Sequence, residues 1–260
     1  MGNKKVALVT GSTSGIGLGI AWKLARDGYD IVLNGLGDKG EIENLRSDIE
    51  KEAEVAVTFE DTDLANPIEI ESMINRVLKV HGSVDILVNN AGIQFVSAVE
   101  DFPTEQWNRV IDINLNAAFH TTRLVTPYMK KNGFGRIVNI ASAHGLVASP
   151  YKSAYVAAKH GIVGFTKAVA LELAEYGVTC NAVCPGWVET PLVRAQVDEL
   201  VQQKEMAEER VISEYMLARQ PTRKFVQTDE VAALVSFLVT DSARSITGSS
   251  YSVDGGWTAH

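Results

Sequence analysis

Seven short apolar segments separated by helical patterns constrain the fold of this chain more than any other feature. They span residues 5–10, 30–34, 55–59, 84–89, 135–142, 178–184 and 250–255. Their hydrophobicity is continuous rather than alternating, which is typical of strands that are buried on both faces. Strands that alternate with helices form right-handed parallel crossovers. The pattern predicts an α/β fold, with a doubly wound parallel sheet of about seven strands and a ligand site at the carboxyl ends of the strands.

One stretch interrupts this alternation before the last helix and strand. Residues 191–220 are helical in propensity and heavily charged. They form either a solvated helical hairpin or a lid, since an insertion at this point emerges on the ligand side of the sheet. The chain contains no internal repeat and no Pro/Gly-rich linker, and 46% of its residues are hydrophobic. We therefore expect a single domain over residues 1–260, with the lid inside it.

The charge of the chain limits its partners. It has 32 acidic and 24 basic residues, which gives a formal net charge of -8. A chain without a basic surface is a poor partner for nucleic acid or for an anionic membrane. The first apolar run, VALV, is too short for a secretory signal or a membrane span. We expect a cytoplasmic protein that binds neither nucleic acid nor membranes.

The two cysteines, Cys180 and Cys184, lie in one apolar run. A strand places them on one face, about 13 Å apart, which is too far for a disulfide. No histidine cluster accompanies them, so we expect buried structural thiols and no metal site.

A glycine-rich turn follows the first predicted strand. Gly11, Gly15 and Gly17 precede the helical run IAWKLARDG. Glycines at a strand-to-helix turn let a pyrophosphate approach the backbone, where it meets the free N–H groups of the helix N-terminus. The alternative is a merely structural turn. The position between a strand and a helix favours a Rossmann-like dinucleotide site.

Tyr155 and Lys159 are four residues apart in a run of small residues. On a helix they lie one turn apart on the same face, so both can reach one small volume. A tyrosine has a pKa of about 10, and an ammonium within about 4–6 Å can lower it by roughly 1–3 units. The pair therefore fits a general base, although a buried helix with two amphipathic side chains gives the same pattern.

These motifs occur together with NNAG at 89–92, Asn114, Ser142 and PG at 185–186. The chain resembles the short-chain dehydrogenase/reductase family over nearly its full length. The resemblance implies an oxidoreductase whose catalytic residues are Asn114, Ser142, Tyr155 and Lys159. Within the family, LVNNAGIQ, KSAYVAAKHG and CPGWVETPLV resemble the D-3-hydroxybutyrate dehydrogenases. That similarity implies NAD-dependent oxidation of D-3-hydroxybutyrate to acetoacetate by a homotetramer.

The resemblance gives several residues a role besides an ordinary structural one. Ser142 holds the reacting oxygen, or else caps a turn. Asn114 binds a water in a proton relay, marks a helix irregularity, or does both. Asp63 binds the adenine amino group, or caps a helix. The cofactor-binding residues implied are Gly11, Thr13, Ser14, Gly15, Ile16, Gly17, Leu36, Asp63, Leu64, Asn90, Ala91, Gly92, Tyr155, Lys159, Pro185, Gly186 and Val188.

The choice between NAD and NADP depends on the end of the second strand, which reads Asn34, Gly35, Leu36. The aspartate that usually binds the adenosine ribose in NAD-dependent members is absent. Residues 12–14 and 34–37 contain no arginine or lysine to pair with the 2′-phosphate of NADP. We therefore expect NAD.

A small hydroxy acid needs strong donors for its carboxylate and an apolar wall for its methyl group. The side chains expected at the carboxylate and the reacting oxygen are Gln94, Ser142, His144, Lys152, Tyr155 and Gln196. Trp187 and Trp257 could form the wall, although tryptophans usually fill cores.

Three alternatives share parts of this pattern. A 3-oxoacyl carrier-protein reductase has the same four catalytic residues, but an acidic carrier calls for a basic surface and the Tyr155 helix continues with Glu172 and Glu175. Sugar or steroid dehydrogenases would have a wider apolar pocket. A non-catalytic NAD-binding regulator would need the glycine loop but not a proton relay.

Overall fold

The computed structural model describes residues 4–259. Its centre is a seven-stranded sheet in the order β3-β2-β1-β4-β5-β6-β7, and every pair of neighbours is parallel. The strands are β1 (Val6–Val9), β2 (Asp30–Asn34), β3 (Val57–Glu60), β4 (Ile86–Asn89), β5 (Gly135–Ile140), β6 (Val178–Pro185) and β7 (Ser250–Val253). The doubly wound sheet expected from the sequence is confirmed, and several strands are one or two residues shorter than the apolar segments.

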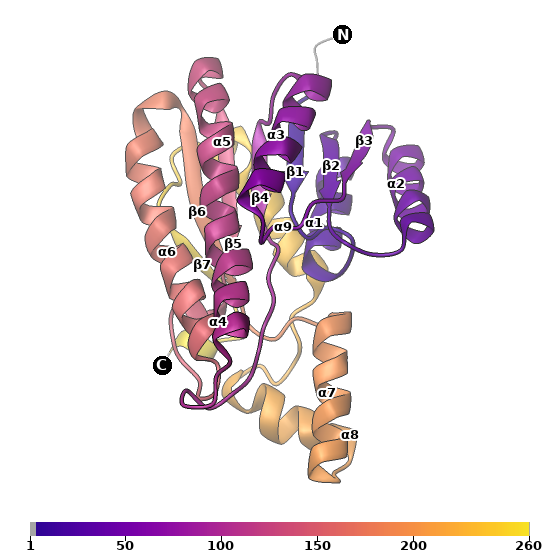
Figure 1. Ribbon diagram of the computed structural model, residues 1–260, viewed down its shortest axis with the longest axis vertical. Coiled ribbons are helices and arrows are strands. Elements are labelled where there is room, and N and C mark those ends of the chain that lie inside the picture. Colours follow the sequence, from indigo (N-terminus) through magenta and orange to yellow (C-terminus); the bar gives the residue numbers. More distant parts are fainter. Residues whose placement is uncertain (1–3, 260) are drawn as a thin grey trace.

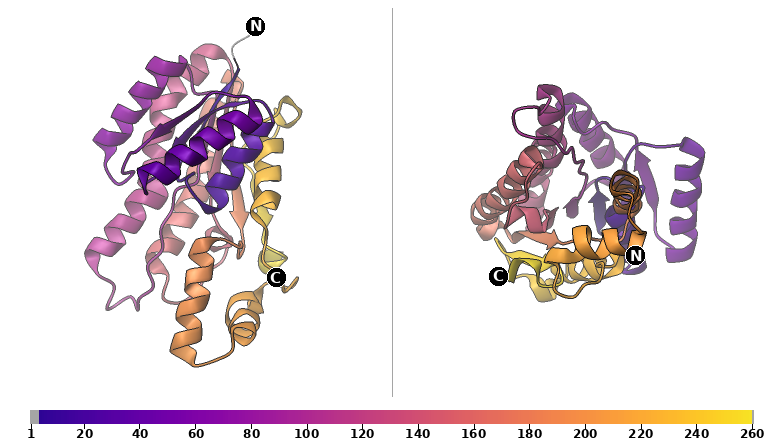
Figure 2. Two further views of the ribbon diagram at one scale, coloured as in Figure 1. Left: turned by 90° about the vertical axis from the view of Figure 1, so that its right-hand side faces the viewer. Right: turned by 90° about the horizontal axis from the view of Figure 1, so that it is seen from below.

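Two layers of helices cover the sheet (Figures 1 and 2). The first layer contains α1 (Gly15–Arg26), α2 (Lys39–Ala53) and α9 (Thr228–Leu238). The second contains α3 (Pro67–His81), α4 (Thr104–Ile111), α5 (Ala117–Asn132) and α6 (Ser153–Leu173). Along β1, Ala7 and Val9 pack into the first core and Val6 and Leu8 into the second. Because both faces of the strand are buried, its sequence is apolar throughout.

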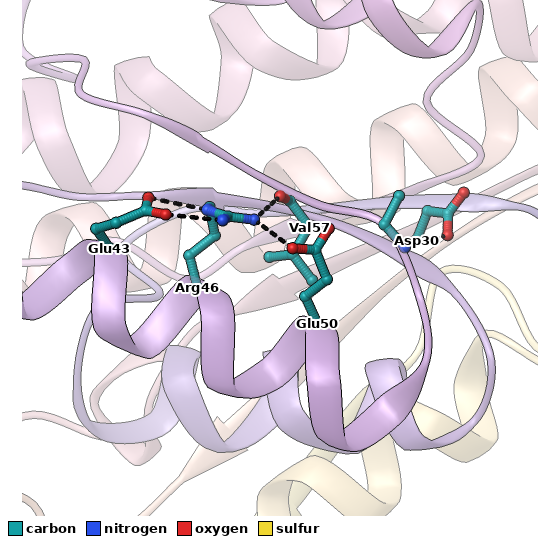
Figure 3. Close-up of polar contacts among 6 residues, drawn as sticks. Asp30, Glu43, Arg46, Glu50 and Val57 are labelled. Atoms are coloured by element: carbon teal, nitrogen blue, oxygen red, sulfur yellow. Dashed lines mark hydrogen bonds and ion pairs between the residues drawn. The ribbon is translucent and has the colours of Figure 1, made fainter.

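A cluster of charged side chains attaches α2 to the edge of the sheet (Figure 3). The Arg46 guanidinium donates to the carboxylates of Glu43 and Glu50, and also to the Val57 carbonyl oxygen at 3.0 Å. The Asp30 carboxylate accepts from the backbone N–H of Ala56 at 2.9 Å. The hydrogen bonds with the Glu43 and Glu50 carboxylates raise the pKa of Arg46. Together these contacts fix α2 to the amino ends of β2 and β3, at the opposite edge of the sheet from the glycine-rich loop.

The segment at 104–131, whose pattern reads as one long helix, is interrupted. A π-helix at Asp112–Asn116 separates α4 from α5. The wider turn places the Asn114 side chain inside the molecule, where it is 3% exposed. A π-turn of this kind is often found at a functional site.

The insertion at 191–220 folds into α7 (Pro191–Lys204), α8 (Glu208–Val211), a π-helix at Ile212–Met216 and a 3₁₀ turn at Leu217–Arg219. We refer to residues 191–220 as the lid. It has a small apolar core of its own, made by Val193, Val197, Val211, Met216 and Leu217. Figures 1 and 2 show α7 and α8 projecting beyond the strand ends. The lid is therefore a separately packed helical unit beside the carboxyl edge of the sheet.

Cys180 and Cys184 are buried and free, as expected. Burial raises the pKa of Cys180 to about 12 and that of Cys184 to about 11, so both are inert thiols. Within residues 4–259, no three His, Cys, Asp or Glu side chains gather as a metal site would require. No helix in the same range has the length and apolarity needed to cross a bilayer.

Candidate active site

A cleft of about 400 Å³ lies at the carboxyl ends of the strands. Its walls come from the loops after β1 and β4, which lie on either side of the point where the strand order reverses. Many of the residues predicted to bind the cofactor or the substrate, or to react, line this cleft. They are Gly11, Thr13, Ser14, Gly15, Ile16, Leu36, Asp63, Leu64, Asn90, Ala91, Gly92, Gln94, Ser142, Tyr155, Lys159, Pro185 and Gly186. One cleft thus collects most of the residues that the sequence singled out.

The glycine-rich loop leaves the N-terminus of α1 open toward this cleft. Gly11 and Gly15 have φ angles of +60° and +55°, a backbone region that favours glycine. Ser14 begins α1 without a capping hydrogen bond from its side chain, and the first turn has no acidic residue. The first-turn N–H groups can therefore meet an anion such as a dinucleotide pyrophosphate. The donor set fits the cofactor that the sequence implies.

Gly17 supports the loop without lining the cleft. A Cβ at this position would lie 2.3 Å from the Gly11 carbonyl oxygen and 2.4 Å from Asn90 Nδ2. Asn90 Nδ2 donates to the carbonyl oxygens of Thr10 and Gly11, at 2.9 and 3.0 Å. Close packing between α1 and the first loop thus requires glycine at position 17. Val188 also lies outside the cleft, buried where its backbone bridges to Val226.

The end of β2 carries no charge into the cleft. Asn34 is fully buried, and it accepts from the Gly11 N–H and donates to the Glu60 carbonyl oxygen. Leu36 is 62% exposed at the cleft wall. Asp63 Oδ1 accepts from the Ala65 N–H at 3.0 Å, and the residue that caps α3 is Asn66. Asp63 is therefore not the helix cap that its position allowed.

Tyr155 and Lys159 lie one turn apart on α6, as their spacing predicts. Lys159 Nζ is 5.5 Å from the centre of the Tyr155 ring and donates to the Ile140 carbonyl oxygen at 2.8 Å. Burial lowers the pKa of Lys159 to about 8. Burial also raises the pKa of Tyr155, and the Ser142 hydroxyl beside it acts in the opposite direction. The net lowering of the Tyr155 pKa that the sequence suggests is not found in the protein alone, because desolvation of the phenolate is the largest effect.

Ser142 lines the cleft and also caps a turn. Its Oγ accepts from the His144 N–H at 3.1 Å at the start of the 3₁₀ turn Ala143–Gly145. The hydroxyl proton is then available to a reacting oxygen. The two interpretations of Ser142 are compatible, because capping fixes the position of the oxygen.

Asn114 shows the helix irregularity expected from its sequence. Its Nδ2 donates to the carbonyl oxygens of Ile93 and Val110, both at 2.8 Å. Its Oδ1 is buried without a partner among the described residues. A cavity of about 10 Å³ beside it also touches Thr10, Asn89 and Thr121. That volume is close to what one water needs, and the orphaned acceptor gives such a water a partner.

Four residues predicted to touch the substrate form a group beside Tyr155, which we call the aromatic–basic cluster: His144, Lys152, Trp187 and Trp257. The His144 ring meets the rings of Tyr155 and Trp257 edge-on, at centroid distances of 5.9 and 5.1 Å. Trp257 stacks on Trp187 at 6.4 Å, and Lys152 Nζ lies 4.9 Å above the Trp187 ring. Side chains from three segments, the β5–α6 connection and the stretches after β6 and β7, thus form one continuous surface next to the tyrosine.

Both bases of the cluster are shifted toward their neutral forms. Burial, reinforced by the charges of Lys152, Arg219 and His160, lowers the pKa of His144 to about 4. Burial lowers the pKa of Lys152 to about 8. An anionic ligand would stabilise the charged lysine and recover much of its desolvation cost.

The cluster does not itself line the large cleft, and neither does Gln196, which is partly buried on α7. Sequence reasoning missed Thr62, Ile93, Arg109, Ile113, Thr190 and Leu192, which do line it. Thr190 had a local signal, because a threonine before a proline often begins a helix, and here its side chain caps α7. No local sequence pattern indicated a functional role for Arg109, since an arginine on an amphipathic helix is normally solvated.

The glycine loop, the cleft and the Tyr155–Lys159 pair define an oxidoreductase with an NAD(P)-binding Rossmann fold. Residues 5–200 match the family model described as short chain dehydrogenase, and the chain belongs to this family of enzymes that act on CH–OH groups.

Full-length relatives are close. The D-beta-hydroxybutyrate dehydrogenase of Rhizobium meliloti is 54% identical over 98% of this chain and 99% of its own length. The D-beta-hydroxybutyrate dehydrogenase of Cupriavidus necator is 52% identical, and the match covers 99% of each chain. A crystal structure of an actinorhodin polyketide ketoreductase variant with NADPH superposes with a TM-score of 0.92, at 38% identity, over 99% of this chain and 98% of that one.

Proposed function

We propose that the protein catalyses the reversible oxidation of D-3-hydroxybutyrate to acetoacetate with NAD. The observation that carries the proposal is the aromatic–basic cluster: the half-buried Lys152 lies over a stacked tryptophan pair, and the buried His144 contacts both Trp257 and Tyr155. A small hydroxy acid presents the matching groups, which are a carboxylate, a hydroxyl and one methyl group. The similarity to two D-beta-hydroxybutyrate dehydrogenases supports the same substrate.

In the proposed reaction, the deprotonated Tyr155 phenolate oxygen takes the proton of the substrate hydroxyl, and becomes a neutral phenol, while hydride leaves the adjacent carbon. NAD, when bound, supplies the hydride acceptor and a positive charge that favours the Tyr155 phenolate. The Ser142 hydroxyl holds the substrate oxygen beside Tyr155, since its Oγ is fixed by the His144 N–H. Tyr155 is thus the general base, in a position that the α6 backbone sets.

Lys159 and Asn114 would return the proton to solvent. Lys159 Nζ is held by the Ile140 carbonyl oxygen, and Asn114 Oδ1 has an unused lone pair near Gly92. A Cβ at Gly92 would lie only 2.5 Å from Asn114 Oδ1 and 3.7 Å from Lys159 Nζ. The absence of a side chain at position 92 therefore brings these groups together around a space that a relay water can use.

For the cofactor we propose NAD rather than NADP. The glycine loop would hold the pyrophosphate, and Leu36, Asp63 and Leu64 would hold the adenosine. The nicotinamide end would be held by Asn90, Ala91, Gly92, Pro185 and Gly186. The uncharged end of β2 supports NAD, because a 2′-phosphate there would have no local cation.

The carboxylate would be bound by Lys152, His144 and Gln94, with Gln196 brought in as the lid closes. Trp187 and Trp257 would form the wall for the methyl group. Leu192 at the start of α7 already lines the cleft, which supports closure of the lid toward it.

We further propose that residues 1–260 act as one catalytic domain, in the cytoplasm, as a homotetramer with two-fold interfaces. Phe119 on α5 is 46% exposed and Leu171 on α6 is 82% exposed, so both helices present apolar side chains outward. Light scattering should give four times the chain mass at assay concentration. A stable monomer would contradict the tetramer without affecting the reaction.

The second candidate is a 3-oxoacyl thioester reductase, since the ketoreductase neighbour shares the fold. One panel distinguishes the candidates: D- and L-3-hydroxybutyrate, a 3-hydroxyacyl thioester and a polyol, each with NAD and with NADP. We expect D-3-hydroxybutyrate with NAD to give the highest kcat/KM. Preference for the thioester with NADP would support the reductase, and NAD binding without any turnover would support a regulator.

A further inference from the structure

His144 has a hydrogen bond that leads away from the substrate side, toward the lid. Its Nε2 lies 2.9 Å from Ser149 Oγ, in the loop between β5 and α6. Arg219, in the last turn of the lid, donates from Nη1 to Ser149 Oγ at 3.3 Å and to the Ala148 carbonyl oxygen at 3.2 Å. A continuous chain of contacts thus runs from the lid guanidinium through one hydroxyl to the imidazole.

The direction of these hydrogen bonds follows from the chemistry of the donors. A guanidinium can only donate, so Ser149 Oγ is an acceptor toward Arg219. The hydroxyl proton of Ser149 then remains to be placed, and the neighbouring imidazole nitrogen is an acceptor for it when that nitrogen carries no proton. When Ser149 donates to Nε2 in this way, the ring proton lies on Nδ1, since a neutral imidazole has one N–H.

We propose that Arg219 and Ser149 are positioning residues that hold His144 in the neutral tautomer protonated on Nδ1, so that the end of the lid determines whether His144 can donate to the substrate. The low pKa of His144, caused by burial and the neighbouring cations Lys152, Arg219 and His160, agrees with a neutral ring. A neutral donor can bind a carboxylate oxygen beside Lys152 without placing a second positive charge next to the lysine. That the acceptor is a substrate carboxylate rests on the proposed function, whereas the tautomer of His144 is independent of it.

The tautomer can be read directly from two-bond ¹H–¹⁵N correlation spectra of the full-length protein labelled at histidine. The chain has five histidines, and the His144→Gln variant assigns the signal of interest. We expect Nδ1–H in the wild type and a gain of the Nε2–H form in Ser149→Ala and Arg219→Ala. Ser213→Ala is the control, because this exposed lid hydroxyl donates only to the Arg210 carbonyl oxygen.

Kinetics give the second measurement. Ser149→Ala should raise the KM for D-3-hydroxybutyrate by about 5–10-fold, the equivalent of one hydrogen bond, and should leave the KM for NAD unchanged. Ser149→Thr retains the hydroxyl and should restore the wild-type KM. The inference would be overturned if the His144 ring of the wild type were protonated on Nε2. It would also be overturned if Ser149→Ala changed neither the tautomer nor the KM. If the wild type does not turn over 3-hydroxybutyrate, the proposed function fails, whereas the spectra of the free protein still decide the tautomer.

Discussion

The cleft and the aromatic–basic cluster lie side by side at the strand ends, but they consist of different kinds of residues. The cleft consists largely of glycines, small residues and backbone groups at strand ends, and hydrogen bonds such as those from Asn90 to the first loop hold it in place. The cluster depends on four long side chains from separate loops and from residues near 257, joined by ring contacts. The shape of the cleft is therefore determined by the fold of the sheet, and the shape of the cluster by side-chain packing.

This difference assigns chemistry and selectivity to separate parts. Cofactor binding and proton transfer need fixed positions, which rigid strand ends provide. Recognition of one small acid needs side chains that can differ between related proteins, which loops provide. Changes in the cleft should therefore affect turnover of every substrate, and changes in the cluster should affect the choice among substrates.

Tyr155→Phe tests the chemical half of this comparison and should have the largest effect. Loss of the phenol removes the general base, so kcat should fall by roughly 10²–10⁴-fold. The variant should bind NAD with nearly wild-type affinity in a calorimetric titration, because the ring remains in place. Turnover close to that of the wild type would remove Tyr155 from the mechanism.

Stability at acidic pH tests the burial of His144 in the cluster. Its pKa is lowered from 6.5 to about 4 in the folded protein. Between these values the unfolded chain binds a proton that the folded protein does not, so stability is lost as the pH falls from about 6.5 to about 4. The contribution amounts to at most about 3 kcal/mol.

Urea titrations across this pH range should show the loss in the wild type and a smaller loss in His144→Gln. Ser213→Ala, at an exposed position in the lid, serves as the control and should behave as the wild type does. Equal pH dependence in His144→Gln and the wild type would mean that His144 titrates normally.

The cofactor preference can be sharpened at Leu36, which is largely exposed at the cleft wall. Leu36→Arg introduces a cation for the 2′-phosphate, and a charge-assisted hydrogen bond contributes roughly 1.5–3 kcal/mol. The kcat/KM for NADP should rise by about one to two decades. Leu36→Ala, which shortens the side chain without adding charge, should not produce this gain. A wild type that already uses NADP as well as NAD would refute the preference.

Much of this architecture could be predicted from the sequence, because its causes are local. Continuous apolar runs mark the buried strands, the glycines mark the loop before α1, and four-residue spacing places Tyr155 and Lys159 on one face. The doubly wound parallel sheet is confirmed by the structure, and the match to the family is confirmed by the family model and the relatives.

The remaining features depend on how distant segments meet. The sequence indicates an irregularity at Asn114, but its form depends on a distant contact: in the π-turn the side-chain amide donates to the carbonyl oxygen of Ile93, in the loop after β4. The raised pKa of Tyr155 results from burial by the assembled protein, which no spacing rule contains. The contacts of Arg219 with Ala148 and Ser149 join residues 71 and 70 positions apart, so neither segment alone indicates them.

Discrimination between an acid and its ester tests the role of the cluster most directly. Lys152 lies over the Trp187 ring beside the reacting tyrosine, and a hydrogen bond to a charged group contributes roughly 1.5–3 kcal/mol. Lys152→Ala should lower the kcat/KM for D-3-hydroxybutyrate at least about tenfold and leave NAD affinity nearly unchanged. Lys51→Ala, at an exposed position on α2, is the matched control.

The decisive measurement is the ratio of kcat/KM for D-3-hydroxybutyrate to that for its methyl ester, in the wild type and in Lys152→Ala. We expect the wild type to prefer the acid strongly, since the ester has no charge for Lys152 to bind. This preference should largely disappear in Lys152→Ala. Equal ratios in the two proteins would show that Lys152 is only a neighbour of the site and would contradict recognition of a hydroxy acid by this cluster.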